Sequence, residues 1–217
     1  MTSSIKPTQL IVAGIGTEIG KTVASAVLTE ALQADYWKPV QSGELDKSDT
    51  MTIRQLVSNR TTVFHPEAYR LTQPLSPHAA AALDGVQITL DNLGVPQTAN
   101  ALVIELAGGL MVPLNSHDLN IDFVKQLTLP VVLVSRNYLG SINHTLLSVE
   151  ACRTRSILII GILFMGDSVP ATEDFILSYT GLPCVGRIKQ EPTLSKEVIK
   201  QYATMLSPRL RQLIEPL

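Results

Sequence analysis

The segment from Gly14 to Thr22 combines residue types that are suited to binding phosphate groups. It reads Gly14-Ile15-Gly16-Thr17-Glu18-Ile19-Gly20-Lys21-Thr22 and stands between a short apolar run and a helix-like stretch. In such a strand–turn–helix arrangement, backbone N–H groups cradle the phosphates and the lysine reaches the outer ones. The threonine hydroxyl is a ligand for magnesium in the same arrangement. The segment therefore predicts a site for a nucleoside triphosphate with Mg²⁺.

The spacing of this loop departs from the standard pattern, which has four residues between its first glycine and the Gly-Lys pair. Gly14 lies one residue too early, and Ile15 occupies the expected position. A glycine turn that only caps a helix would explain Gly20, but not the string Gly20-Lys21-Thr22 between a strand and a helix. We therefore favour a phosphate site of a variant subclass.

Four further polar residues stand where they could serve such a site. Glu105 ends an apolar run, where a carboxylate is costly unless it faces a cation or water. It could ligate magnesium, and the alternative is a strand-end acid in solvent. Asp49 could be only a helix N-cap, and Lys38 could be an ordinary surface lysine. Ser42 supplies a hydroxyl in a turn, which is a weak signal by itself.

The hydrophobic pattern alternates short apolar runs with helix-like stretches. We expect strands at residues 10–13, 36–40 (broken by Pro39), 101–105, 130–135, 157–164 and 183–185. We expect helices at residues 23–32, 51–57, 79–83, 121–127, 142–154, 171–180 and 194–206, with an irregular connection over 59–78.

This alternation predicts an α/β fold, in which a parallel sheet is covered by helices on both faces. The near-continuous apolar runs favour strands that are buried on both sides. Ligands of such sheets bind at the carboxyl ends of the strands. The 217 residues fit one domain over residues 1–217, so we expect a single domain of the P-loop NTPase class.

The composition argues against several kinds of partner and location. A net charge of -2 and a pI near 6.1 give no reason to expect nucleic acid or an anionic membrane surface. The longest apolar run, 157–165, is far too short to cross a bilayer, and residues 1–9 lack the apolar centre of a signal peptide. Cys152 and Cys184 have no metal-like spacing, so we expect reduced core thiols. These features predict a soluble cytoplasmic protein.

Several motifs follow one another in a distinctive order. They are Gly20-Lys21-Thr22, residues 37–43, Ser48-Asp49, Ser76-Pro77-His78, residues 105–109 and residues 139–144. Together they resemble the dethiobiotin synthetase family, ATP-dependent enzymes of biotin biosynthesis. The resemblance extends from about Leu10 to about Pro192. Its most specific parts are the early-glycine loop and the Lys-Pro-Val-x-Ser-Gly string.

The resemblance implies a homodimer that closes a cyclic urea on 7,8-diaminononanoate. Carbon dioxide, supplied as bicarbonate, adds to one amine to give a carbamate, ATP phosphorylates the carbamate, and the second amine closes the ring. Anionic groups meet in this reaction, so Lys21, Lys38 and magnesium would have to offset their repulsion. The resemblance further implies that Thr17 and Ser42 hydrogen-bond the carbamate.

The resemblance also implies roles for other positions. Magnesium would lie among Thr22, Asp49 and Glu105. The phosphates would bind the backbone of Glu18, Ile19, Gly20, Lys21, Thr22 and Val23, and the turn at Gly108-Gly109 would approach the substrate and nucleotide. The far carboxylate of the substrate would meet a helix N-terminus at Ser141 and Asn143 of the partner subunit, and a plain helix surface is the alternative for Asn143.

The chain departs from the family pattern most clearly at the nucleotide base. The family has an Asn-Asp pair whose Asn reads the adenine edge, and this chain has Gly166-Asp167. A glycine supplies no side-chain hydrogen bond, so base discrimination should weaken unless Asp167 or residues near Ile188 and Lys189 substitute. Leu106 also replaces a turn glycine of the family. We expect retained chemistry with an open nucleotide preference.

Two other readings compete with this one. Partition-type ATPases switch between monomer and dimer, and they carry a second lysine five residues before the lysine of the Gly-Lys pair, where this chain has Gly16. They also need a membrane-targeting helix or a basic surface, and residues 206–217 are too short and weakly patterned for that. A decayed nucleotide-binding module is less favoured, because the candidate residues of the phosphate and carbamate sites are retained together.

Overall fold

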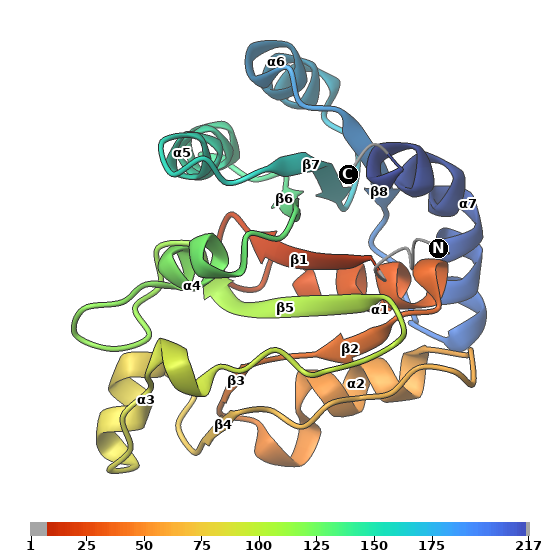
Figure 1. Cartoon of the computed structure of the whole chain (residues 1–217). Helices are drawn as coiled ribbons and strands as arrows, with labels where there is room; N and C mark the ends of the chain where they lie inside the picture. Colours follow the sequence, from red (N-terminus) through yellow and green to blue (C-terminus); the bar gives the residue numbers. More distant parts are fainter. Residues whose placement is uncertain (1–7, 216–217) are drawn as a thin grey trace, which may run out of the picture.

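Six parallel strands form the central sheet of the protein, whose computed structural model describes residues 8–215 (Figure 1). The strands are β1 (Gln9–Gly14), β2 (Asp35–Trp37), β5 (Leu102–Gly109), β6 (Val131–Arg136), β7 (Ile159–Met165) and β8 (Cys184–Ile188). Their order across the sheet is β2-β5-β1-β6-β7-β8. Nearly every residue of β1, β6 and β7 is buried, which confirms the predicted parallel sheet with both faces covered.

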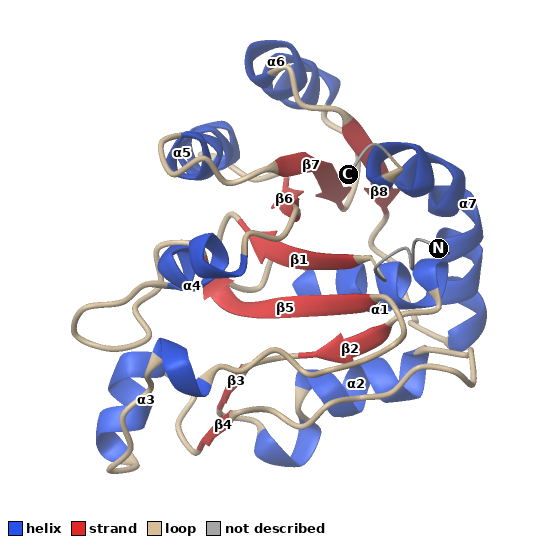
Figure 2. Ribbon diagram, in the orientation of Figure 1, coloured by secondary structure: helices blue, strands red, loops and turns tan. Residues whose placement is uncertain are grey.

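The helices cover both faces (Figure 2), because the crossover from β1 to β2 runs in one direction across the sheet, whereas the crossovers from β5 to β6, β6 to β7 and β7 to β8 run in the other. Crossovers between parallel strands are right-handed, so a connection that turns left and one that turns right lie on opposite faces. One group contains α1 (Lys21–Leu32), α2 (Asp49–Leu56) and α7 (Lys196–Ile214), which pack on one another. The other contains α4 (Asn120–Leu127), α5 (Ser141–Arg153) and α6 (Pro170–Thr180).

A second, two-stranded sheet corrects the expectation for residues 36–40 and 59–78. It pairs β3 (Val40–Ser42) with β4 (Tyr69–Leu71), and α3 (Pro77–Leu83) packs beside it. Pro39 has no N–H group and cannot continue the hydrogen-bond ladder of β2. The chain therefore leaves the central sheet at Lys38 and resumes as a strand of the small sheet, with a partner taken from the supposedly irregular segment.

Three other elements are longer than the sequence predicted. β5 continues to Gly109, so Glu105 lies inside this strand and does not end it. β8 runs to Ile188 instead of Val185. The last helix, α7, passes through Pro208 and ends at Ile214 instead of Leu206.

The length of α7 follows from its buried stripe. The side chains that pack inward recur at helical spacing on both sides of Pro208: Ile199, Ala203, Leu206 and Leu210. A proline inside a helix costs about 3 kcal/mol, and burial of this stripe offsets that cost. Residues 206–214 therefore belong to a helix of the core.

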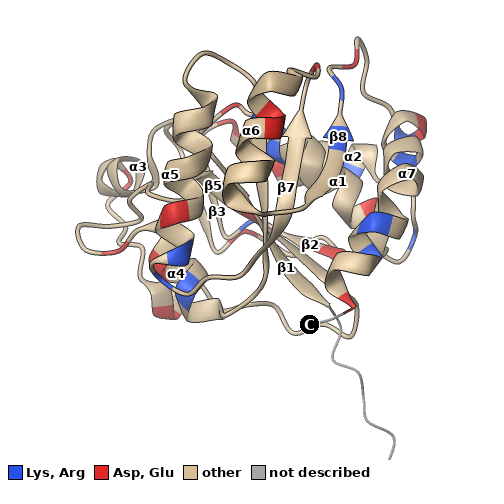
Figure 3. Ribbon diagram, turned by 90° about the horizontal axis from the view of Figure 1, so that it is seen from above, with Lys and Arg blue, Asp and Glu red and all other residues tan. Residues whose placement is uncertain are grey.

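The charged residues and the thiols can be compared with the expectations from composition. Basic and acidic residues are intermixed along α4 and α7 (Figure 3). None of the helices within residues 8–215 has the length and hydrophobicity that a membrane span requires. Cys152 is buried and Cys184 is half-buried, and both thiols are free. Most of residues 1–9, on which the expectation about a signal peptide rests, lie outside the described residues.

Candidate active site

A cavity of about 790 Å³ opens at the carboxyl edge of the central sheet, between the phosphate loop and the small sheet. This is the edge at which parallel α/β sheets bind their ligands. The residues predicted from the sequence that line it are Thr17, Glu18, Gly20, Lys21, Thr22, Val23, Lys38, Ser42, Asp49, Glu105 and Gly108. The fold thus brings most of the predicted site together from distant segments.

The phosphate loop spans the gap between β1 and α1, as predicted. Gly20 precedes the helix with φ of 97°, and a side chain there would lie 2.7 Å from Cε of Met165. A side chain at Gly14 would lie 2.6 Å from Cδ1 of Ile19. Close packing inside the loop therefore explains why a glycine occupies position 14, one residue earlier than the standard pattern places it.

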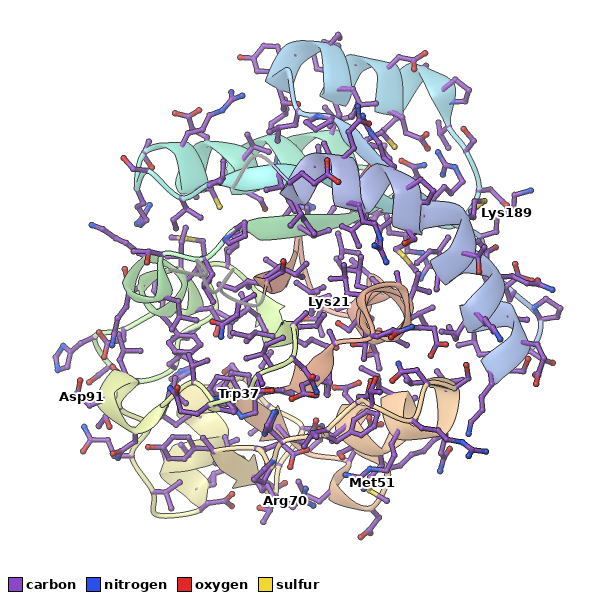
Figure 4. The ribbon with its side chains drawn as sticks, turned by 45° about the vertical axis from the view of Figure 1, so that its right-hand side comes forward. Lys21, Trp37, Met51, Arg70, Asp91 and Lys189 are labelled. Atoms are coloured by element: carbon purple, nitrogen blue, oxygen red, sulfur yellow. The ribbon has the colours of Figure 1, made fainter. Side chains whose placement is uncertain are left out.

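Lys21 lies at the start of α1 and points back across this loop (Figure 4). Its Nζ atom donates a hydrogen bond to the carbonyl oxygen of Gly16 at 2.8 Å. Burial lowers the pKa of Lys21 to about 8, because the attraction of Glu105 only partly compensates and Lys38 adds repulsion. A phosphate group at the loop would raise this pKa again, because it favours the charged form.

The predicted metal ligands converge on the hydroxyl of Thr22. Its Oγ1 atom donates to Oδ1 of Asp49 at 2.5 Å and lies 3.4 Å from Oε1 of Glu105. Carboxylate and hydroxyl oxygens are the hard ligands that Mg²⁺ prefers, and Mg²⁺ usually keeps several waters, so few protein ligands suffice. The donor set therefore fits magnesium.

Lys38 bridges the same two carboxylates. Its ammonium forms an ion pair with Asp49 and lies 3.5 Å from Oε1 of Glu105. Burial opposes the charge of Lys38, but the two carboxylates outweigh it and raise the pKa of this lysine. Burial likewise opposes the charge of Asp49, and Lys38 with the hydrogen bond from Thr22 outweighs it and lowers the pKa of Asp49. Lys38 therefore lies in the site as a permanent cation and is not a surface lysine.

Sequence reasoning missed two residues that hold these groups. The hydroxyl of the fully buried Tyr36 donates to Oε2 of Glu105 at 3.1 Å. Oε1 of Gln41 accepts a hydrogen bond from the amide of Asp49 at 3.4 Å. Tyr36 and Lys38 are two residues apart on an extended segment, so both side chains point to one face. The two-residue spacing from Lys38 could therefore have pointed to Tyr36, whereas no feature of the sequence pointed to Gln41.

The small sheet and the following loop form the opposite wall of the cavity. Ser42 at the end of β3 has a buried Oγ atom that finds no hydrogen-bond partner within the described chain. Gly108 has φ of 74°, and a side chain there would lie 2.9 Å from Val112 and 3.5 Å from Oγ1 of Thr17. Glycine at position 108 therefore keeps the space beside the Thr17 hydroxyl open.

Some predicted residues lie outside this cavity. Ile19 lines a second cavity of about 510 Å³ on the outer side of the phosphate loop. Gly109 packs against the backbone of Gly14 and Gly16. Ser141 is buried at the start of α5 and Asn143 is exposed there, so within one subunit neither reaches the cavity.

The residues expected at the nucleotide base lie at the ends of β7 and β8. Gly166 and Asp167 directly follow β7, and the amide of Gly166 donates to the carbonyl oxygen of Ile188 at 2.8 Å. Lys189 directly follows β8 (Figure 4). Neither of the two cavities described above includes these residues, so their role in base binding stays a prediction.

Comparisons with known proteins agree on one family. A family model described as an AAA domain matches residues 8–198. An ATP-dependent dethiobiotin synthetase BioD of Christiangramia forsetii is 50% identical over 204 residues, which cover 94% of this chain and 98% of the relative. The synthetase BioD of Cytophaga hutchinsonii is 47% identical, with 90% and 95% covered.

Solved structures show the same fold at low identity. A plasmid partition protein from Borrelia burgdorferi has a TM-score of 0.57 and 14% identity, covering 95% of this chain and 99% of that one. A ParA family ATPase from Chlorobium tepidum has a TM-score of 0.52 and 14% identity, with 96% of each chain covered. These likenesses concern the P-loop NTPase-like architecture alone.

Proposed function

Because the chain belongs to the ATP-dependent dethiobiotin synthetase family, and is thus an ATP-dependent cyclo-ligase, we propose how its residues carry out dethiobiotin synthesis. The substrates are 7,8-diaminononanoate, carbon dioxide or bicarbonate, and ATP. One observation carries the proposal: the buried, unpartnered hydroxyl of Ser42 lines the same cavity as Lys21 and Lys38. A buried hydroxyl without a partner is costly, and a carbamate oxygen would provide the missing partner.

The carbamate is held between the two walls of the cavity. The hydroxyls of Thr17 and Ser42 donate hydrogen bonds to its oxygens, and the ammonium of Lys38 offsets its charge. Gly108 leaves the room beside Thr17 that the substrate needs. This arrangement brings the carbamate oxygen to the γ-phosphate, and positioning of the two reactants is the main catalytic contribution in phosphoryl transfer.

The phosphate loop holds ATP on the other side of the carbamate. Backbone N–H groups from Glu18 to Val23 bind the phosphates, and Lys21 leaves the carbonyl oxygen of Gly16 to reach the outer phosphate. Thr22, Asp49 and Glu105 would hold Mg²⁺, which neutralises phosphate charge when it is bound. Lys38 stabilises the charge on the transferring phosphoryl group, and the second amine then closes the ring with release of phosphate.

The N-terminus of α5 does not reach its own cavity, so a second subunit is needed for the substrate's far carboxylate. We propose a homodimer in which Ser141 and Asn143 of one protomer meet the carboxylate bound in its partner. Helix N-termini favour anions. The reaction draws on the ATP pool, and we place the protein in the cytoplasm.

The partition-type alternative is not favoured. The likeness to ParA and partition proteins is one of fold, at 14% identity. Gly16 stands where those ATPases carry their second lysine, and residues 206–214 pack on the core as part of α7. Among the described residues, the alternative therefore finds neither the lysine nor a free terminal helix.

Isotope labelling tests the proposal. The protein is incubated with 7,8-diaminononanoate, ¹³C-bicarbonate, magnesium and ATP, and the products are followed by mass spectrometry and a phosphate assay. We expect a cyclic urea that carries one ¹³C atom and one phosphate released per ring. Phosphate release that does not depend on the diamine, without a labelled ring, would contradict the proposal. Sedimentation of the same preparation measures the dimer.

A further inference from the structure

A buried ion pair lies next to the loop that follows β7. Glu173 of α6 pairs with Arg187 of β8, and only 6% of Glu173 is exposed. The carboxylate also accepts hydrogen bonds from Nδ2 of Asn137 at 2.5 Å and from the amide of Val169 at 3.0 Å. Burial opposes the charge of this carboxylate, but these hydrogen bonds and Arg187 outweigh it and lower the pKa of Glu173. Glu173 is therefore a charged centre that joins three elements.

The partners of Glu173 also bind the main chain of this loop. Nη1 of Arg187 donates to the carbonyl oxygen of Gly166 at 3.1 Å, and its Nη2 lies 3.4 Å from Oγ of Ser168. Nδ2 of Asn137 donates to the carbonyl oxygen of Asp167 at 3.1 Å. The backbone over residues 166–169 is thus fixed from the ends of β6 and β8 and from α6.

This loop begins beside the phosphate loop. Met165, the last residue of β7, contacts Gly20, whose added Cβ would lie 2.7 Å from Cε of Met165. In the opposite direction along the sheet edge lie Lys38 and Ser42, where the diamine is proposed to bind. A nucleotide whose phosphates occupy the phosphate loop can therefore extend its base towards the ends of β7 and β8, on the side away from Lys38 and Ser42.

We propose that Asn137, Glu173 and Arg187 are positioning residues for the nucleotide base, an inference that rests on the proposed function. They hold the loop so that its main chain, and not a side chain at Gly166, meets the base. The amides of Asp167 and Ser168 have no acceptor within the described chain, and they are the donors that this loop offers. A ring nitrogen or carbonyl oxygen of any base can accept from them.

Arg187→Lys separates this role from a general contribution to stability. Lysine keeps the positive charge next to Glu173, but it lacks the planar fork with which arginine also reaches Gly166 and Ser168. Arg70→Lys is the matched control, because Arg70 likewise pairs with a carboxylate, that of Glu67, at 3.0 Å and donates to a carbonyl oxygen at 3.1 Å. Figure 4 shows Arg70 far from Lys189, which follows β8.

Calorimetric titrations with ATP and with inorganic tripolyphosphate, both with magnesium and without the diamine, test the proposal. The dissociation constant for tripolyphosphate divided by that for ATP measures how much the nucleoside adds to the affinity of the phosphates. We expect Arg187→Lys to reduce this ratio by about tenfold, the scale of one or two lost hydrogen bonds, and Arg70→Lys to leave it unchanged. Asn137→Ser, which removes the carboxamide that donates to Asp167 and Glu173, should act in the same direction.

Equal changes in the affinity for both ligands, or no change in either, would overturn the proposal. Such a result would leave Glu173 and Arg187 as a purely structural pair. The titrations need no turnover, so their outcome is separate from that of the labelling experiment. A chain that makes no dethiobiotin could still show the expected ratio, and an active enzyme could fail to show it.

Discussion

At the scale of single residues, the site depends on how two carboxylates and two lysines are arranged. Asp49 and Glu105 lie on either side of the Thr22 hydroxyl, and Lys38 contacts both acids. Lys21 turns towards the phosphate loop instead. The two lysines therefore differ in their surroundings, and their opposite pKa shifts follow from this difference.

Replacement of Lys38 should separate turnover from nucleotide binding. In Lys38→Ala we expect turnover to fall by about 10²- to 10³-fold, the usual loss when one donor to a developing charge is removed. The affinity for ATP should change by no more than about threefold, since the phosphate loop is untouched. Steady-state kinetics and calorimetry measure the two quantities, with Lys125→Ala on α4 as the control. Equal losses in both would remove Lys38 from the reacting phosphoryl group.

The metal site makes a prediction about Glu105. Glu105→Gln keeps the shape of the side chain and an oxygen that can accept from Tyr36, but it removes the negative charge. We expect the magnesium concentration for half-maximal activity to rise by at least about tenfold, and calorimetry should show weaker Mg²⁺ binding. Glu67→Gln, outside the cavity, is the control. An unchanged magnesium requirement would show that Glu105 is not a metal ligand.

The lowered pKa of Lys21 predicts how ATP affinity depends on pH. Lys21 has a pKa of about 8 in the folded protein, against 10.5 for an ordinary lysine. Its charge therefore destabilises the native state below pH 8, and this destabilisation disappears as the pH rises from 8 towards 10.5. Phosphate binding needs the charged form, so ATP should bind about tenfold more weakly at pH 9 than at pH 7. Titrations across this range measure the effect. Constant affinity would mean that Lys21 stays charged throughout.

Much of the site could be read from residue types and spacing. The loop could be recognised because the string Gly20-Lys21-Thr22 stands between a strand and a helix. Glu105 could be recognised because a carboxylate in an apolar strand is costly unless it faces a cation or water. The contacts of Tyr36 and Gln41 could not be read in the same way. The contact of Tyr36 with Glu105 depends on β2 and β5 being neighbours in the sheet, and a single sequence does not state that order. The contact of Gln41 with Asp49 depends on how the chain turns between β3 and α2.

At the scale of elements, α2 matters because its first residue is Asp49. Ser48 caps this helix by accepting a hydrogen bond from the amide of Met51 at 3.3 Å. Ser48→Ala should destabilise the protein by about 1 kcal/mol, or about 2–4 °C in melting temperature. It should also weaken magnesium binding, because the start of α2 would fray.

The cap of α7 provides the control for this prediction. Ser195 accepts from the amide of Val198 at 3.3 Å, in the same geometry, but no site residue begins that helix. Ser195→Ala should lower the melting temperature by a similar amount and leave the magnesium requirement unchanged. Calorimetry and a magnesium titration of both variants distinguish the two helices. If both variants had the same magnesium requirement, the cap of α2 would not be needed to position Asp49.

Some of the strands and helix ends could be predicted from the sequence, and others could not. Most strands of the central sheet were predictable because their apolar runs are long. The small sheet was not, since β3 and β4 have three residues each, and so short a run carries no clear periodicity. The end of α7 was misplaced because residues 206–217 are weakly patterned, whereas in the structure the buried apolar stripe continues to Leu210, beyond Pro208.

At the scale of the whole molecule, the position of Gly166 predicts a tolerant nucleotide site. In the proposed binding mode, the phosphates and the carbamate meet backbone amides, hydroxyls and two lysines. The base would meet a loop whose main chain is held in place and which has no side chain at Gly166. GTP or CTP should therefore support turnover within about tenfold of ATP, a difference of about 1.4 kcal/mol. Competition assays with the three nucleotides measure this. A strict requirement for ATP would contradict it.

The division into two sheets has a consequence for how such an enzyme can diversify. The groups that handle phosphate belong to the central sheet and its helices, whereas Ser42 and much of the opposite wall belong to the small sheet and the segment after it. Along the chain, the two sheets are joined directly at Lys38-Pro39. Changes of length between Leu71 and Pro77, where the loop lines the cavity, can therefore reshape the substrate wall and leave the phosphate loop unchanged. Relatives of such an enzyme could in this way accept new substrates and keep the same use of ATP.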